Sequence, residues 1–198
     1  AGPRQSVDEP LGVGGENLHT WVFTLAAWRR MHGMEGGDTG PSNAVVEESQ
    51  QNVGATIMGR NMFGGHPGPW DPNDPWNGWW GDDPPFRHPV FVLTHHARDP
   101  LALEGGTTFV FVTEGIEAAL QKAREAAGGK DVMLGGGADV AQQYLRAGLV
   151  DEMEIHLVPI LLGSGERLFE GTGTGLHDLE LVRTVAAPGV THFKFARR

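Results

Sequence analysis

Three consecutive glycines, Gly135, Gly136 and Gly137, stand between an apolar run and a helix-like segment in the stretch DVMLGGGADVAQQYL. A turn from a strand into a helix needs one glycine, or at most two. A helix that begins directly after glycines presents free backbone N–H groups and the positive end of its dipole, which suits a pyrophosphate. The glycines therefore predict close approach of an anionic ligand, with tight packing of the helix on a sheet as the alternative.

A second junction has the same character. The segment IMGRNMF puts Gly59, Arg60 and Asn61 where a buried strand gives way to a short helix. Arg60 could add a bidentate contact to a phosphate, or it could be an ordinary surface arginine. Two strand-to-helix junctions of this kind suit a dinucleotide better than a mononucleotide.

Two familiar phosphate-binding motifs do not fit the three glycines. A Walker A loop requires a lysine after its last glycine, and none follows here. A dinucleotide fingerprint requires a third spaced glycine, where this chain has Val140, and an acidic residue at the end of the next strand. Asp151 and Glu154 instead stand at the start and in the middle of that strand. The prediction of an anion site therefore depends on backbone geometry and not on a known motif.

The composition restricts the class of protein. The chain has 198 residues, of which 39% are hydrophobic and 20% charged, and we expect a single domain over residues 1–198. A net charge of −10 with scattered Lys and Arg argues against nucleic-acid binding. No apolar run approaches the roughly 20 residues that cross a bilayer, so no membrane partner is expected. The absence of cysteine excludes disulfides and fits a cytoplasmic location.

The histidines do not predict a metal site. His95 and His96 are adjacent, so their side chains point to opposite sides of an extended chain, and no H-x-x-x-H pair exists. Zinc needs convergent ligands, and no such set is evident. His156 shares a strand face with Glu152 and Glu154, and we expect it to be solvated.

A long loop is expected over residues 64–89, which hold four of the six tryptophans and many prolines. Its residues Trp76, Trp79 and Trp80 could stack on a flat heteroaromatic substrate, or could pin the loop onto the domain or a partner subunit. Asp38, in a loop between two expected helices, could face a substrate or be an ordinary polar residue of the loop.

Strands alternate with helices along most of the chain, which predicts an α/β fold with a mixed sheet. Pro188-Gly189 predicts a closing antiparallel hairpin. Helices are expected over 16–33, 41–54 (capped by Ser42 or Asn43), 115–129 and 138–148, and strands over 55–58, 89–96, 107–113, 131–134, 150–161, 179–187 and 190–196.

Three segments together carry a family resemblance. MGRNMF, LTHHAR and VMLGGGADVAQQYLRAGLVDEMEIHLVPILLGSGERLF, in this order, resemble the dihydrofolate-reductase-like superfamily. The closest resemblance is to the C-terminal reductase domain of the bifunctional riboflavin-biosynthesis deaminase/reductase, over residues 17–198. The resemblance implies a mixed sheet flanked by helices with an antiparallel C-terminal hairpin, NADPH as cofactor, hydride transfer to a C=N or C=O bond, and a homodimer that uses part of the C-terminal sheet.

The resemblance also implies a set of site residues. The cofactor contacts would be Gly59, Arg60, Asn61, Met62, Thr94, His95, Arg98, Gly135, Gly136, Gly137 and Ala138. The third glycine would remove a side chain that collides with the pyrophosphate. The candidates on the substrate side are Asp38, Trp79, Leu162 and Gly163.

The sequence departs from the family pattern at its start. Its first residues resemble the segment that follows the family's first strand. We therefore expect that strand to precede Ala1, and any catalytic residues on it are unassigned. Basic residues for a phosphoribosyl-pyrimidine substrate are not evident. A 5-amino-6-(5-phosphoribosylamino)uracil reductase-like activity is therefore one reading. A dihydrofolate or pterin reductase and a non-catalytic nucleotide-binding scaffold are the alternatives.

Overall fold

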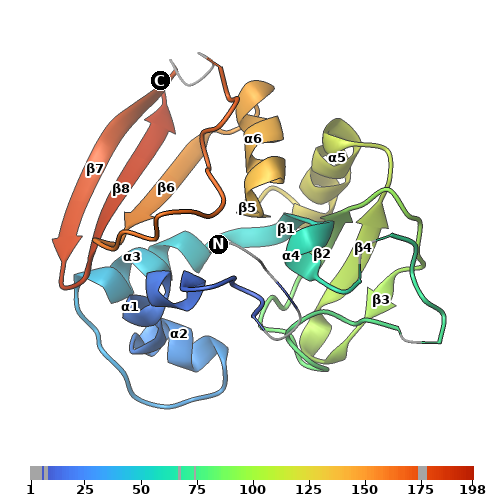
Figure 1. The fold of residues 1–198 in the computed structure, drawn as a ribbon, viewed down its shortest axis with the longest axis horizontal. Coiled ribbons are helices and arrows are strands. Elements are labelled where there is room, and N and C mark those ends of the chain that lie inside the picture. The colour runs from blue at the N-terminus through green and yellow to red at the C-terminus, as the bar shows by residue number, and fades with distance from the viewer. Residues whose placement is uncertain (1–5, 7–8, 67, 74, 174–177) are drawn as a thin grey trace. The chain divides into compact units, whose positions relative to one another are not determined.

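A computed structural model describes residues 6, 9–66, 68–73, 75–173 and 178–198 of the chain (Figure 1). The contacts divide the chain into two compact units. The central unit comprises Asn52–Gln143, and the terminal unit comprises the residues up to Gln51 together with Tyr144–Arg198. The single domain expected over residues 1–198 stays a prediction, and each unit is described by itself. No helix of the described residues is long and apolar enough to span a membrane.

The central unit is built on a five-stranded sheet with the order β3-β4-β2-β1-β5. All neighbours in it are parallel except β3 and β4. The strands are β1 (Val53–Gly59), β2 (Pro89–Leu93), β3 (Leu101–Ala102), β4 (Thr108–Val112) and β5 (Asp131–Gly136). The runs PVFVL and TFVFV suit strands covered on both faces, since they are rich in β-branched and aromatic residues. The short β3 and the 3-10 turn η2 (Glu104–Gly106) were not expected.

Helix α5 (Ile116–Ala127) packs across β1, β2 and β5. Its buried residues Ala119, Ala123 and Ala127 recur every four positions, which is the spacing of one helix face. Small side chains let the helix come close to the sheet. A Cβ at Gly54 would lie 2.7 Å from the carbonyl oxygen of Ala127, so this glycine serves packing inside β1 and does not end the preceding helix.

The loop 64–89 packs on the core of its own unit. Met58, Phe63, Val90, Val92, Phe109 and Phe111 form a buried cluster, and Trp70, Trp76, Trp80 and Phe86 pack against it. Trp76 also donates its indole N–H to the carbonyl oxygen of Phe63, at 2.8 Å. For Trp76 and Trp80, the structure thus supports the expectation that the loop is pinned onto the domain.

The terminal unit contains an antiparallel sheet with the order β6-β8-β7. Its strands are β6 (Glu152–Leu157), β7 (Leu179–Ala187) and β8 (Val190–Arg197), and the expected hairpin at Pro188-Gly189 is confirmed. Helix α3 (Pro41–Gln50) packs on β7 and β8. Glu48 of this helix pairs with Arg183 at 2.5 Å and with Lys194 at 3.1 Å.

The single helix expected over 16–33 is wrong. The segment forms η1 (Gly15–Leu18), α1 (Thr20–Phe23) and α2 (Ala26–Met31), and the chain is extended at Leu25 (φ −71°, ψ 140°). Leu25 forms a β-bridge with Asp38, and the N–H of Ala26 bonds to the carbonyl oxygen of Asp38 at 2.9 Å. The apolar spacing suits a helix, but these distant backbone bonds interrupt it.

The caps expected for α3 are also wrong. Gly40 is the N-cap, and neither Ser42 nor Asn43 caps the helix with its side chain. The Asn43 side chain instead accepts the N–H of Ala27 at 2.7 Å, and the Ser42 hydroxyl bonds to His192 at 2.9 Å. Both residues therefore join separate elements of the terminal unit.

Candidate functional site

The two glycine junctions lie at the same edge of the central sheet. Gly59 pairs with Leu93 of β2, and its neighbour Met58 pairs with Gly136 of β5. Because β1, β2 and β5 are parallel neighbours, their carboxyl ends meet at this edge. Ligands of open α/β sheets bind at such an edge. The segments that follow the three strands, each with predicted cofactor residues, are thus brought together within one unit.

Gly59 is a glycine because of packing. A Cβ on it would lie 2.8 Å from Cγ2 of Val140, in the first turn of α6 (Ala138–Arg146). The start of α6 therefore rests directly on the end of β1. Gly135 has looser surroundings, since a Cβ there would stay 3.4 Å from Thr56 and 3.6 Å from Met62. Tight packing of helix and sheet, which was the alternative raised for residues 135–137, is thus found at Gly59.

Gly136 and Gly137 have different reasons for lacking a side chain. Gly136 has a φ of +104°, which side chains with a Cβ rarely adopt, and the peptide bond to Gly137 is cis. Gly137 has no positive φ, and a Cβ on it would meet no atom of the other described residues within 4 Å, its chain neighbours aside. Neither packing among the described residues nor φ explains Gly137. An open, exposed glycine at the start of α6 is what close approach of a ligand requires.

Arg60 follows Gly59 directly as the first residue of α4 (Arg60–Phe63). Its Nη2 donates to the carbonyl oxygen of His66 at 2.9 Å, and its guanidinium carbon lies 3.7 Å from the centroid of the Trp70 ring. Its Nε is buried and has no hydrogen-bond acceptor in the part of the chain that the structure describes. Burial, and secondly the charge of Arg98, lower the pKa of Arg60 from its ordinary value. The guanidinium thus has donor capacity that no atom of the described residues uses.

Arg98 lies near the same tryptophan. Its guanidinium carbon is 4.9 Å from the Trp70 centroid and 5.1 Å from that of Phe111. Its nitrogens donate to the carbonyl oxygen of Trp76 and to the side chain of Asn77, at 2.5 and 3.0 Å. Burial lowers the pKa of Arg98 as well. Two partly buried positive charges therefore share one edge of the sheet.

The other predicted cofactor residues occupy the same strand ends. Thr94 follows β2 and is buried, and its hydroxyl accepts the N–H of His96 at 3.2 Å. His95 and Asn61 are exposed. Met62 lies beside the glycines, with its sulfur 3.9 Å from a Cβ built on Gly136. Ala138 is the first residue of α6.

This arrangement suits an anionic ligand. The orphaned Nε of Arg60, the charge of Arg98 and the open backbone at Gly137 all offer donors or positive charge at the edge. A partly buried guanidinium is stabilised by an anion that forms charge-assisted hydrogen bonds with it. The residues present therefore fit a phosphate-bearing cofactor.

Comparison with known proteins identifies the family. The RibD C-terminal domain family matches residues 23–193. The chain belongs to this family. The family is that of the reductase domain of riboflavin biosynthesis, so the resemblance noted in the sequence is confirmed. A search of curated proteins found no match.

Solved structures share the fold of this RibD C-terminal domain family member. A provisionally assigned riboflavin biosynthesis protein from Shewanella sp. PV-4 is 23% identical, with a TM-score of 0.57 over 85% of this chain and 86% of that one. RibD from Acinetobacter baumannii is 16% identical, with a TM-score of 0.53 over 83% of this chain and 52% of that one. This chain thus spans about half of the Acinetobacter protein. The expected α/β, dihydrofolate-reductase-like fold is confirmed.

The four substrate-side candidates are not brought together within one unit. Trp79 is in the central unit, where its ring lies edge-on to Trp76 with centroids 4.6 Å apart. Asp38, Leu162 and Gly163 are in the terminal unit. The backbone of Asp38 bonds to Thr24 and Ala26, and its side chain is exposed. The assignment of these four residues to the substrate stays a prediction.

Sequence reasoning missed a polar cluster in the terminal unit. His156 of β6 and His192 of β8 are register partners, and their Nδ1 atoms are 2.7 Å apart. Nε2 of His192 bonds to the Ser42 hydroxyl, and the Trp21 ring lies 5.0 and 5.1 Å from the two imidazoles. His156 is exposed, as expected from the sequence, and it also bonds to His192. Only the strand register shows this pairing.

Proposed function

We propose that this chain is an NADPH-dependent reductase that transfers a hydride to a heterocyclic or carbonyl acceptor. The acceptor we favour is that of a 5-amino-6-(5-phosphoribosylamino)uracil reductase of riboflavin biosynthesis. Membership of the RibD C-terminal domain family supports the reductase class and the pathway. The cytoplasmic location expected from the cysteine-free sequence stays a prediction.

One observation carries the choice of a phosphorylated dinucleotide. The carboxyl ends of β1 and β5 are adjacent. Arg60, which follows β1, has an unused buried donor. Gly137, which follows β5, lacks a side chain for a reason that neither packing nor φ explains. Two separate strand-to-helix junctions at one edge suit a ligand with more than one phosphate. The family resemblance implies the same cofactor.

In this proposal the residues of the edge bind and orient the cofactor. The backbone of Gly136 and Gly137 contacts the pyrophosphate, and Arg60 and Arg98 neutralise phosphate charge. Met62, next to the glycines, limits the movement of the bound cofactor. The bound cofactor supplies the hydride, and the protein's contribution is to hold donor and acceptor in register.

The direct test is binding followed by turnover. Purified protein is titrated with NADPH and with NADH while cofactor fluorescence is recorded. NADPH oxidation is then followed with 5-amino-6-(5-phosphoribosylamino)uracil, a dihydropterin and small carbonyl compounds. Binding of NADPH with oxidation by the ribosylaminouracil is the expected result. If the folded protein binds neither cofactor, the reductase proposal is wrong and a non-catalytic scaffold is favoured. If only the dihydropterin is reduced, the protein is a pterin reductase.

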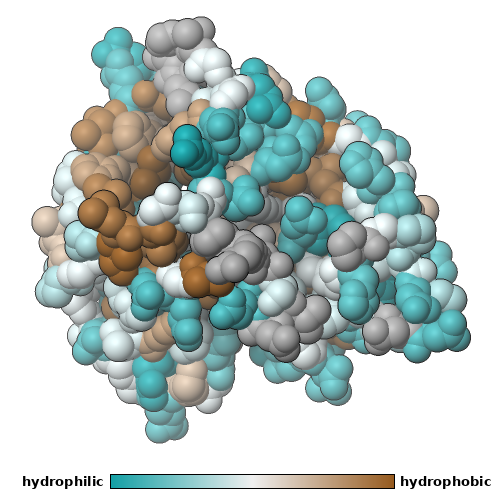
Figure 2. All heavy atoms as spheres, in the orientation of Figure 1, coloured by the Kyte–Doolittle hydropathy of each residue, from teal (hydrophilic) through white to brown (hydrophobic). Residues whose placement is uncertain are grey.

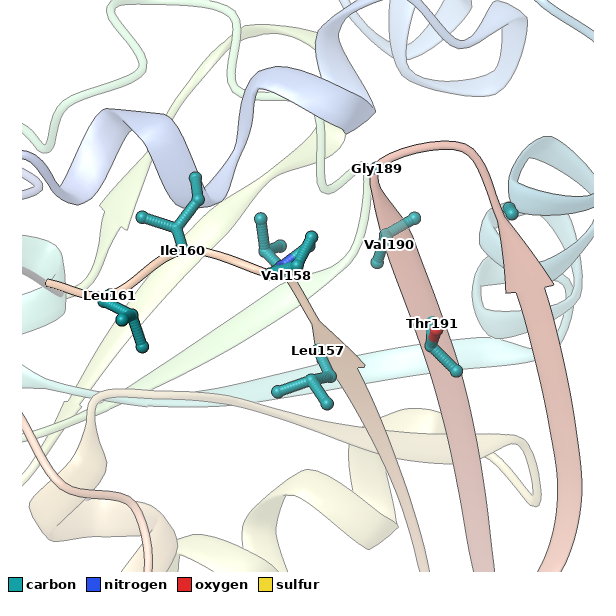
Figure 3. A pocket seen from close by; sticks show the side chains of 9 residues that line it. Leu157, Val158, Ile160, Leu161, Gly189, Val190 and Thr191 are labelled. Carbon is teal, nitrogen blue, oxygen red and sulfur yellow. The ribbon is translucent and has the colours of Figure 1, made fainter.

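We further propose that the chain forms a homodimer through the terminal unit. Leu157, Ile160 and Leu161 are exposed, with Leu161 fully so, and they line a shallow, mostly apolar pocket of about 340 Å³ (Figure 3). Figure 2 shows hydrophobic side chains gathered on the left of the view, around the end of β6. Leu181 and Val182 of β7 are exposed as well. Exposed apolar patches on a sheet favour association, which agrees with the dimer that the family resemblance implies.

A further inference from the structure

Trp70 connects the two arginines of the sheet edge. It lies in the loop 64–89, and the guanidinium carbons of Arg60 and Arg98 are 3.7 and 4.9 Å from its ring centroid. Its indole N–H donates to the carbonyl oxygen of His96, just after β2, at 2.8 Å. Its ring also meets Phe111 edge-on, at 5.0 Å. Trp70 is therefore held in place by β2 and β4 while both cations contact it.

In the described part of the loop, the acceptors that bond to these cations are neutral. Arg60 donates to the carbonyl oxygen of His66, and Arg98 donates to the carbonyl oxygen of Trp76 and the amide of Asn77. Among the described residues, neither arginine has a carboxylate within ion-pair distance. Cation–π contact attracts a guanidinium without cancelling its charge. Both charges therefore stay available to a ligand.

Arg87, at the far end of the same loop, shows the contrast. Both of its terminal nitrogens bond to the carboxylate of Asp83, which forms a bidentate ion pair at the surface. An arginine that only fastens this loop is thus neutralised by an acidic partner. Arg60 and Arg98 are more buried and have an aromatic ring in place of a carboxylate. The aromatic ring holds Arg60 and Arg98 in position without cancelling their positive charge.

We infer that Trp70 is a positioning residue, whose ring holds Arg60 and Arg98 at the sheet edge to receive a phosphate group of the dinucleotide. The inference rests on the proposed function and adds a role for the loop. A loop that contains no anion-binding motif would then hold the two arginines of the anion site in place. The phosphate is either the pyrophosphate or the 2′-phosphate, and these two are separated by comparing cofactors.

The test is a set of binding titrations with NADPH and NADH on Trp70→Leu, Trp70→Phe and the parent. Loss of the ring in Trp70→Leu should weaken NADPH binding about tenfold, while Trp70→Phe should retain most of the affinity because it keeps an aromatic face. A loss confined to NADPH identifies the 2′-phosphate, and an equal loss for NADH identifies the pyrophosphate. Both results support the inference, and unchanged binding of both cofactors by Trp70→Leu overturns it.

Two controls separate positioning from loop destabilisation. Trp80→Leu removes another tryptophan of the same loop that packs on Phe86 and does not contact either arginine. It should lower the thermal midpoint and leave NADPH affinity unchanged. In an Arg60→Ala, Arg98→Ala background, Trp70→Leu should have little further effect, because the ring acts through the arginines.

The results that would overturn this inference differ from the results that would overturn the proposed reductase function. A further loss of about tenfold in the double-arginine background would overturn the inference and leave the reductase proposal standing. A parent protein that binds neither cofactor would overturn both. Loss of NADPH binding in Trp80→Leu equal to that in Trp70→Leu would show that general loop integrity is responsible, and would also overturn the inference.

Discussion

Nδ1 of His156 lies 2.7 Å from Nδ1 of His192, directly across the β6–β8 ladder. One of these nitrogens donates and the other accepts, so the pair cannot tolerate protons on both. Desolvation, and secondly the neighbouring His192, lower the pKa of His156 to about 4. Desolvation, and secondly the charge of Arg183, lower the pKa of His192. The folded terminal unit therefore holds both rings neutral near pH 7.

This pair predicts that the protein loses stability in mild acid. Between about pH 4 and 6.5 the unfolded chain binds more protons at His156 than the folded chain, so stability rises with pH in that window and is level above it. Because His156 is partly exposed, we expect a loss of only roughly 1 kcal/mol, or about 2–4 °C in Tm, between pH 7 and 5. Thermal melts across this range measure it. His156→Gln should flatten the dependence.

Alanine at position 137 separates ligand approach from packing. Gly137→Ala adds one methyl group where no atom of another described segment lies within 4 Å. The fold should therefore persist, while NADPH affinity falls about tenfold or more through a clash with the cofactor. Gly40→Ala is the matched control, since its site is equally open and its φ is negative. Titration and thermal melts are recorded for both. If the Gly137→Ala protein binds NADPH as tightly as the parent, the cofactor does not approach this glycine.

Valine at position 136 should be more severe. Gly136→Val should abolish NADPH binding, and it should also cost about 1–3 kcal/mol of stability because the φ of +104° is strained for a side chain with a branched Cβ. The thermal midpoint must therefore be measured beside the affinity. Retained NADPH affinity in a folded Gly136→Val protein would remove the backbone of this residue from the cofactor site.

Arg60→Ala tests the charge at the site. It should weaken NADPH binding by about 1.5–3 kcal/mol, the range for a hydrogen bond to a charged group. It should cost little stability, because the parent buries an unused donor there. Arg124→Ala on the exposed face of α5 removes the same charge from the same unit and should leave affinity unchanged. Equal affinities for all three proteins would assign Arg60 to structure alone.

The dimer proposal is tested at its apolar surface. Leu161→Lys places a charge at a fully exposed leucine beside the pocket, and burying that charge in an interface is unfavourable. The parent should scatter light as a dimer at micromolar concentration, and the variant should be a monomer with an unchanged fold. A monomeric parent under these conditions would contradict the proposal.

The sequence alone predicted the strand-to-helix junctions at Gly59 and Gly137. Their signals are local, since a short apolar run that ends at glycine before a polar, helix-like segment is contained within about a dozen residues. Parallel connectivity then implies that the junctions share a sheet edge. The family, the α/β class and the closing hairpin could be inferred from local sequence patterns of the same kind. The resemblance supplied the cofactor assignment, which periodicity could not.

The tertiary structure alone decided the features that depend on contacts between distant residues. The bridge from Leu25 to Asp38 breaks a segment whose spacing suits one helix, and strand register joins His156 to His192. The distinction between Gly59 and Gly137 requires knowing that a Cβ on Gly59 would clash with Val140, whereas a Cβ on Gly137 would meet no other described segment. Trp70 gains its role only because the loop folds back over two arginines. Local preference determines which elements form, and long-range packing determines which side chains meet, so only the folded chain reveals these partnerships.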